Sequence, residues 1–206
     1  MRKTTTLLLL LVSLNMLAAD ISDFFISGPD SLFAVIDRGT RMDMVDYYHS
    51  GRKIEIDNRL NGSSAIDTLS DSYIKIKLSE SAILEMQLKI AGSADTVVVV
   101  SKTLNEPAPD SELMFFDRFW RPLEAEKFIS VPRIEDFVYG VSGKEKEELL
   151  SLVEYPLISI SFDNGKLVAG QSFENCMIKE NYEQLKPFLK DKISYRWTGK
   201  KFKREE

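Results

Sequence analysis

The chain contains one histidine, His49, and its spacing from two aspartates raises the question of a metal or acid–base site. Asp43, Asp46 and His49 recur at every third position, which on a helix can bring a base and two carboxylates near one face. Such a group could transfer protons or hold a metal ion. The identity of the site therefore depends on the element that positions these residues.

A helix start just before these residues gives Asp43 a structural role. Thr40 has the chemistry of a helix N-cap, and Asp43 lies where its carboxylate can reach the backbone N–H of the cap. The apolar residues that follow have helical spacing: Met44, Val45 and Tyr48. Asp46 and His49 remain as a surface pair, and two ligands are fewer than a zinc site requires. We therefore expect no catalytic residue, cofactor-binding residue or metal ligand in this stretch.

Glycines delimit this helix and a shorter one before it. Pro29–Ser31 predicts the start of the shorter helix, and Gly39 its end. Gly51 predicts the end of the second helix in the left-handed conformation that glycine adopts without strain. Two short helices are thus expected before the first strand.

The first 19 residues have the pattern of a cleavable secretory signal. A positive start precedes the apolar run Leu7–Val12, and Ala18 and Ala19 form a small-residue end. The apolar run is well short of the roughly 20 residues that span a bilayer. The only cysteine, Cys176, is far from the cleavage point that a lipoprotein signal would require. We expect cleavage after Ala19, no transmembrane segment after it, and a periplasmic or secreted protein.

Charge and cysteine content limit the partners and the chemistry. The chain has a formal charge of −5, and it becomes more negative without the signal, whose charged residues, Arg2 and Lys3, are both basic. Nucleic-acid binding depends on clustered Lys and Arg, so we expect no nucleic-acid partner. A single cysteine cannot form an internal disulfide, and we expect Cys176 to be a small buried residue rather than a nucleophile.

Alternation of apolar and polar residues indicates antiparallel strands after residue 53. Residues 73–78 and 84–90 alternate cleanly and predict a hairpin with one side in solvent. Its polar positions would face each other across the strands: Lys75 and Lys77 on one, Glu85 and Gln87 on the other. Such opposite-charge pairing supports this register.

The next two strands have no solvent-facing side. Val97–Val100 and Leu113–Phe116 are apolar at consecutive positions, so both faces of the sheet must be covered there. The N-terminal helices can cover one face, and we expect the C-terminal half to cover most of the other. Phe119 and Trp120 follow on a turn. They are either a docking patch, and then the expected partner-binding residues, or part of the core.

The second half repeats the order of helix and antiparallel strands. Residues 124–143 are irregular apart from a short helix at 134–137. The elements expected beyond them are a helix at 144–153, a hairpin at 157–170, a helix at 182–190 and a hairpin at 193–203. Asn164 and Gly165 predict a type I′ turn rather than a calcium loop, because the alternating oxygen ligands are missing.

Together these elements predict an α+β fold in which antiparallel hairpins form a meander with helices packed on the sheet. The expected divisions are a signal peptide at 1–19, an α+β half at 20–140 and a second α+β half at 141–206 packed against it. The similar order of elements in the two halves is an architectural likeness without repeated residues.

Two strings in the N-terminal third resemble a known family. Residues 25–32 read FISGPDSL and residues 41–48 read RMDMVDYY, and both resemble the secreted Bacteroidales family catalogued as domain of unknown function 3256. The string WRPL at 120–123 is a weaker likeness. The resemblance implies a cell-envelope location and carries no activity to this chain.

The leading functional hypothesis is a non-catalytic envelope protein that binds a protein, a glycan or another copy of itself. The chain has no G-x-S-x-G elbow, no H-E-x-x-H, no C-x-x-C and no phosphate-binding glycine loop. No cofactor is expected. A glycan hydrolase with paired carboxylates is an alternative, since that chemistry leaves no fixed spacing in a sequence.

A second alternative is binding of an anionic envelope polymer by the C-terminal hairpin. Basic and aromatic residues interleave there: Lys200, Lys201, Lys203 and Arg204 with Tyr195, Trp197 and Phe202. Ile193, Tyr195 and Trp197 would share one face of a strand, however. The competing interpretation is a hairpin that faces the core and has a solvated basic end.

Overall fold

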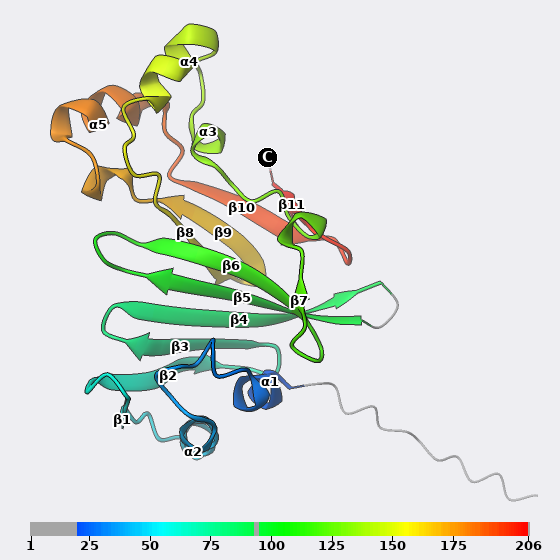
Figure 1. Cartoon of the computed structure of the whole chain (residues 1–206). Helices are drawn as coiled ribbons and strands as arrows, with labels where there is room; N and C mark the ends of the chain where they lie inside the picture. The colour runs from blue at the N-terminus through cyan, green and yellow to red at the C-terminus, as the bar shows by residue number, and fades with distance from the viewer. Residues whose placement is uncertain (1–19, 93–94, 206) are drawn as a thin grey trace, which may run out of the picture.

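The computed structural model describes residues 20–92 and 95–205, and its strands form two antiparallel sheets (Figure 1). The signal predicted at residues 1–19 lies outside this part of the chain. The first sheet follows chain order: β1 (Ile56–Asp57), β2 (Ser63–Leu69), β3 (Tyr73–Ser79), β4 (Ala82–Ala91), β5 (Asp95–Leu104), β6 (Asp110–Asp117) and β7 (Pro122–Leu123). The second has the order β11 (Phe202–Arg204), β10 (Lys192–Trp197), β9 (Lys166–Gln171) and β8 (Ile158–Asp163).

The helices lie at the two ends of the assembly. In Figure 1, α1 (Ile21–Ser27) and α2 (Arg38–His49) lie on one side of the first sheet. The second sheet lies on the other side with the remaining helical turns: η1 (Ala125–Lys127), α3 (Ile134–Phe137), α4 (Gly143–Leu150), η2 (Phe173–Asn175), α5 (Lys179–Leu185) and η3 (Lys186–Phe188). The α+β fold class with antiparallel sheets is confirmed. None of the helices in the described residues is long and apolar enough to cross a bilayer.

Strand β5 is shared by two hydrophobic cores. Val98 and Val100 pack with α1, α2 and the inner residues of β3 and β4. Val97 and Val99 point the other way and pack with residues of β8 to β11. All four valines are buried, which confirms that both faces of the sheet are covered here. The second sheet covers the face that the N-terminal helices cannot reach, while the division of the chain at residue 140 stays a prediction.

The N-terminal helices differ from the expectation. Residues 30–36, expected as a helix, form successive turns, with backbone bonds from Leu32 to Pro29 and from Ile36 to Phe33. The first helix is α1 instead, capped by the Asp20 side chain. The N-cap of α2 is Asp37, whose carboxylate accepts from the Thr40 N–H at 2.9 Å, so the assignment of Thr40 as the cap is wrong. An ionised carboxylate satisfies a free N–H at least as well as a hydroxyl.

The end of α2 is as expected. Gly51 has a φ of +75°, and the two backbone bonds of a Schellman motif run from Gly51 to Tyr48 and from Arg52 to Tyr47. The expected apolar stripe also holds, since Met44 and Val45 are buried and Tyr48 packs against the first core.

The hairpin of β3 and β4 has the expected register and an unexpected environment. Lys75 lies opposite Glu85, as predicted, although Gln87 pairs with Tyr73 rather than with a lysine. The prediction of a solvent-facing side is wrong, because Glu85 is 4% exposed and Gln87 is also buried. The second sheet packs over these polar residues, as shown by the contact between the rings of Tyr73 and Phe162.

Most elements of the second half match the sequence prediction. The short helix α3 spans Ile134–Phe137, and Asn164 and Gly165 both have positive φ in the turn between β8 and β9. The helix expected at 182–190 begins earlier, at Lys179, and its α-helical part ends at Leu185. The chain continues as the 3-10 helix η3, and Pro187 contributes to this change because it has no N–H to donate to the preceding turn.

Candidate functional site

The residues that first raised the question of a site lie on the surface. Asp43, Asp46 and His49 are all exposed on α2. The described residues contain no group of three or more His, Cys, Asp or Glu side chains that could hold a metal ion. The structure gives these three residues no shared chemistry beyond that of a solvated helix face.

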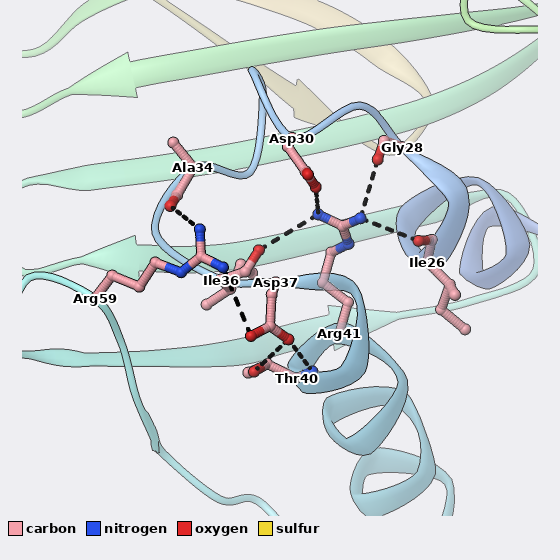
Figure 2. A network of polar contacts seen from close by, with 9 residues as sticks. All are labelled: Ile26, Gly28, Asp30, Ala34, Ile36, Asp37, Thr40, Arg41 and Arg59. Atoms are coloured by element: carbon pink, nitrogen blue, oxygen red, sulfur yellow. Dashed lines mark hydrogen bonds and ion pairs between the residues drawn. The ribbon is translucent and has the colours of Figure 1, made fainter.

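The neighbouring Arg41 is the residue in this region that sequence reasoning missed. Its side chain is 1% exposed and lies between α2 and the segment after α1 (Figure 2). The guanidinium donates to the carbonyls of Ile26 at 3.1 Å, Gly28 at 3.0 Å and Ile36 at 3.4 Å. It also lies 3.7 Å from Asp30 and 4.7 Å from the centre of the Phe33 ring.

Arg41 explains why the two strings at 25–32 and 41–48 occur together. One string supplies the carbonyl oxygens and the other supplies the arginine that binds them. Burial lowers the pKa of the Arg41 guanidinium, and the neighbouring carboxylate of Asp30 opposes this shift. The strings therefore have a structural role. A signal was present in the sequence, since Arg41 lies three residues before Met44 on the side of the helix expected to be buried.

Glu85 is a buried carboxyl group whose pKa is raised. Burial is the main cause, and the hydrogen bond from the Tyr73 hydroxyl and the charge of Lys75 oppose it. The pKa of Tyr73 is also raised, chiefly by burial and then by its hydrogen bond to Glu85. Glu85 lies between the two sheets and lines neither of the two surface hollows described below. A glycosidase needs two carboxyl groups that are open to a cleft, and Glu85 is buried between the sheets.

The turn after β6 separates the two aromatic residues predicted to bind a partner. Trp120 has a φ of +62°, which turns its side chain back toward the first core. Its ring contacts Phe24, Phe33 and Phe116, with centroids 5.2 to 6.5 Å apart. Trp120 thus joins the turn to α1 and to the segment after it.

Phe119 points away from the protein and is 62% exposed. The Asp117 carboxylate accepts from the backbone N–H groups of Phe119 at 2.8 Å and Arg121 at 3.0 Å, which fixes the turn. The guanidinium carbons of Arg118 and Arg121 lie 4.6 and 5.3 Å from the centre of the Phe119 ring. An exposed aromatic ring between two arginines, on a turn held by side-chain hydrogen bonds, is the first candidate site. We call it the Phe119 turn, residues 117–121.

In the C-terminal hairpin the lysine side chains are exposed and the aromatic side chains pack on the second core. Tyr195 and Phe202 are buried in the second core, and Trp197 stacks on Phe128 and donates its ring N–H to the Ile90 carbonyl. The side chains of Lys200, Lys201 and Lys203 are exposed. The aromatic residues therefore cannot stack on a polymer, in agreement with the interpretation of a core-facing hairpin with a solvated basic end.

A hollow of about 960 Å³ lies beside this hairpin, between β11 and the segment at 126–136. Ile129, Tyr195 and Phe202 form its apolar lining. Lys201 and Lys203 lie on the β11 side, and the carboxylates of Glu126, Glu135 and Asp136 lie on the side of the 126–136 segment. We call it the β11 groove. Its lining comes from two segments that are far apart in the chain, residues 126–136 and 195–204, so no local pattern could have predicted it.

A second hollow, of about 510 Å³, lies where three loops meet at the end of the second sheet. Its lining is mainly apolar: Pro107, Tyr155, Leu157, Met177 and Ile178, with Glu154, Asn175 and Cys176. Cys176 is partly exposed, so the expectation of a buried cysteine is wrong. The flanking residues Asn175 and Met177 give no indication of the distant loops that form this hollow.

Comparison with known proteins assigns the chain to a family. The family described as "Protein of unknown function (DUF3256)" matches residues 13–202, and the chain belongs to it. A solved structure, "Structure of a domain of an uncharacterized protein from Porphyromonas gingivalis W83", is similar with a TM-score of 0.77. The two chains are 20% identical, and the match covers 90% of this chain and 97% of the other. No curated protein matches. The likeness shows the fold.

Proposed function

We propose that this member of the DUF3256 family is a non-catalytic binding protein of the cell envelope that docks a protein partner through the Phe119 turn. The observation that carries this proposal is the orientation of Phe119. Its ring is exposed between Arg118 and Arg121, on a turn that Asp117 and Trp120 hold in one conformation. Aromatic residues and arginine are enriched at the energetic centres of protein interfaces.

The chemistry of the turn indicates the kind of partner. Arg121 is paired with Asp117, whereas Arg118 forms no ion pair within the described residues. A partner with an apolar pocket for Phe119 and an acidic group at its rim would match both features. Because the turn is already ordered, little conformational entropy is lost when such a partner binds.

The two alternative functions lack an observation of equal weight. A glycan hydrolase would need a pair of carboxyl groups that face each other in a cleft. Glu126, Glu135 and Asp136 line the β11 groove, and Asp136 is held in an ion pair with Arg204. A binder of anionic polymer would use exposed aromatic residues beside the basic ones, but Tyr195 and Phe202 are buried. The exposed lysines of this hairpin could attract an anionic polymer by charge alone, without stacking on an aromatic ring.

Photo-crosslinking in the native cell tests the docking proposal. Phe119 is replaced by p-benzoylphenylalanine, and Tyr139, an exposed aromatic residue elsewhere, receives the same replacement as the control. A defined adduct at position 119 and none at 139 is expected. The partner identified in that adduct should then bind the Phe119→Ala variant about tenfold or more weakly than the unmodified protein. Equal affinity of the partner for the unmodified protein and for the Phe119→Ala variant contradicts the proposal, as does the absence of an adduct at position 119.

The envelope location is part of the same proposal. It is supported by the signal-like pattern of residues 1–19 and the position of Cys176, far from any lipoprotein cleavage point. The protein recovered from its host should have the mass of residues 20–206. A species that retains residues 1–19 or carries a lipid would contradict it.

A further inference from the structure

The two edge strands of the second sheet, β8 and β11, differ in how their outer backbone groups are hydrogen-bonded. At the β8 edge, the N–H groups of Ile158 and Ile160 donate to the side chains of Asp110 and Ser111, at 3.0 and 2.8 Å. The Ile160 carbonyl accepts from the Ser101 hydroxyl at 2.6 Å. Side chains of the first sheet therefore satisfy this edge, and no further strand can be added to it.

The opposite edge, β11, faces the β11 groove. Thr198 donates to the Lys201 carbonyl and Glu205 to the Ser194 carbonyl, so odd-numbered residues of β11 bond to β10. Antiparallel pairing then directs the backbone groups of Phe202 and Arg204 outward. Within residues 20–92 and 95–205, one backbone hydrogen bond reaches this outer side, from the Phe202 N–H to the Phe128 carbonyl at 2.7 Å. The Phe202 carbonyl and the Arg204 N–H and carbonyl are left facing the groove.

With a volume of about 960 Å³, the groove has room for a short extended segment. Val131, which is 42% exposed, lines it together with the buried Ile129 and Phe202. Arg204 reaches across to Asp136 at 3.2 Å, so the ion pair closes the C-terminal end of the open edge. Three or so residues of a peptide, at about 3.3 Å each, would fill the remaining edge.

The alternation of side chains on β11 determines the peptide sequence that would fit. A strand added beside β11 places its side chains alternately next to Phe202 and next to Lys201 and Lys203. The first position lies over apolar lining, and the second faces exposed lysines that form no ion pair within the described part of the chain. Apolar and acidic residues in alternation would therefore complement this edge.

We propose that the β11 groove binds an extended peptide segment of another protein, with alternating acidic and apolar residues, as a fifth strand of the second sheet. Main-chain hydrogen bonds to Phe202 and Arg204 supply the register, and Lys201 and Lys203 select the acidic side chains. This site is separate from the Phe119 turn and does not depend on it.

Peptide binding by the full mature chain tests the proposal. The probe is a fluorescein-labelled peptide of alternating valine and glutamate, roughly seven residues long, so that it fills the three or so paired positions and extends beyond them on both sides. Fluorescence anisotropy should show binding that Lys203→Glu weakens by about fivefold or more, the scale of a reversed exposed ion pair. Lys200→Glu is the matched control, because it makes the same charge change in the same hairpin outside the groove, and it should leave the affinity within about twofold.

Methylated peptides separate strand addition from simple charge attraction, with the protein unchanged. Methyl groups on alternate backbone nitrogens block one edge of an extended peptide and leave the other edge intact. One of the two methylated series should lose binding at least about tenfold, while the other retains it. Equal affinity of both series overturns the proposal, as does the absence of peptide binding.

An anionic glycan provides the last comparison. If polygalacturonate binds with the same dependence on Lys203 and the peptide does not, the groove recognises charge without strand addition, and the proposal is wrong. Thermal unfolding of Lys203→Glu checks that the variant is folded, which the exposure of this side chain leads us to expect.

Discussion

Arg41 shows how one buried cation can fix the geometry of several loops. Its guanidinium donates to three backbone carbonyls, those of Ile26, Gly28 and Ile36. Removal of the side chain would leave these carbonyls buried without a donor, a situation that destabilises proteins by more than the loss of a surface contact.

We expect Arg41→Ala to lower the free energy of unfolding by about 3 kcal/mol, measured by urea denaturation. Arg38→Ala, an exposed arginine on the same helix, should change it by less than about 0.5 kcal/mol. Arg41→Lys should recover only part of the loss, because an ammonium group cannot reproduce the planar fork of the guanidinium. Equal effects of the Arg41→Ala and Arg38→Ala variants would refute the structural role.

Glu85 should stabilise the folded protein at low pH and less so at high pH, the reverse of the usual behaviour of a carboxyl group. Burial raises the pKa of its carboxyl group in the folded state, so the folded protein holds this proton more tightly than the unfolded chain. The contribution of Glu85 to stability is full below the ordinary glutamate pKa of about 4.3 and is lost as the pH rises through the folded value.

Glu85→Gln should therefore be more stable than the unmodified protein at about pH 8, with a difference that shrinks toward pH 4. Thermal unfolding followed across this range measures the effect. Glu112→Gln, at an exposed carboxylate on the neighbouring β6, serves as the control and should show no such trend. A difference that grows as the pH falls would mean that the carboxylate, and not the acid, is the favoured form.

At the scale of elements, the Phe119 turn has an inner and an outer residue. Trp120→Ala should lower the free energy of unfolding by about 3 kcal/mol, because its ring packs on Phe24, Phe33 and Phe116. Phe119→Ala should leave stability within about 0.5 kcal/mol, since the ring is exposed. Chemical denaturation of the two variants side by side gives the comparison. Similar losses for both would place Phe119 in the core.

The three loops around Cys176 make its thiol accessible in the native protein. We expect a small thiol reagent to modify it without prior unfolding, more slowly than in denaturant, because the side chain is partly buried in a hollow. The rate of absorbance change with such a reagent is the measurement. Modification only after unfolding would return Cys176 to the buried role that its flanking sequence predicted.

Local signals in the sequence were sufficient for many elements. Asn164 and Gly165 are typical of the tight turn that they form. The short helix at Ile134–Phe137 was also predicted from the residues around it. The register of Lys75 opposite Glu85 also follows from alternation. These features depend on neighbours in the chain, which a sequence displays directly.

What the sequence did not reveal depends on distant segments. Phe119 and Trp120 are adjacent aromatic residues, and only the positive φ of Trp120 and its contact with α1 separate their roles. Burial of Glu85 requires the second sheet, more than seventy residues later in the chain. The helix expected after Pro29 failed for a similar reason, since its Ile36 carbonyl accepts from Arg41 and tertiary contact overrode the local start signal.

At the scale of the whole molecule, the two sheets depend on each other for coverage. A fragment of residues 20–140 would expose the buried face of Val97, Val99 and Phe115. We expect this fragment to bind a hydrophobic dye and to self-associate, whereas the chain of residues 20–206 should do neither. Dye fluorescence and sedimentation velocity measure the two properties. A stable, monodisperse fragment that ignores the dye would show that the first sheet is self-sufficient.

The order of strands in the first sheet has a consequence for folding kinetics. Each strand from β1 to β7 pairs with its neighbour in the chain, so the sheet forms without long loop closures. Low contact order of this kind favours fast assembly, strand by strand as the polypeptide emerges. The second sheet packs on β5 and β6, which are distant in the chain, so we expect docking of the two sheets to be the slow step. Until that step is complete, a newly made chain carries an exposed strip of valine and phenylalanine, which is the period of greatest risk of aggregation.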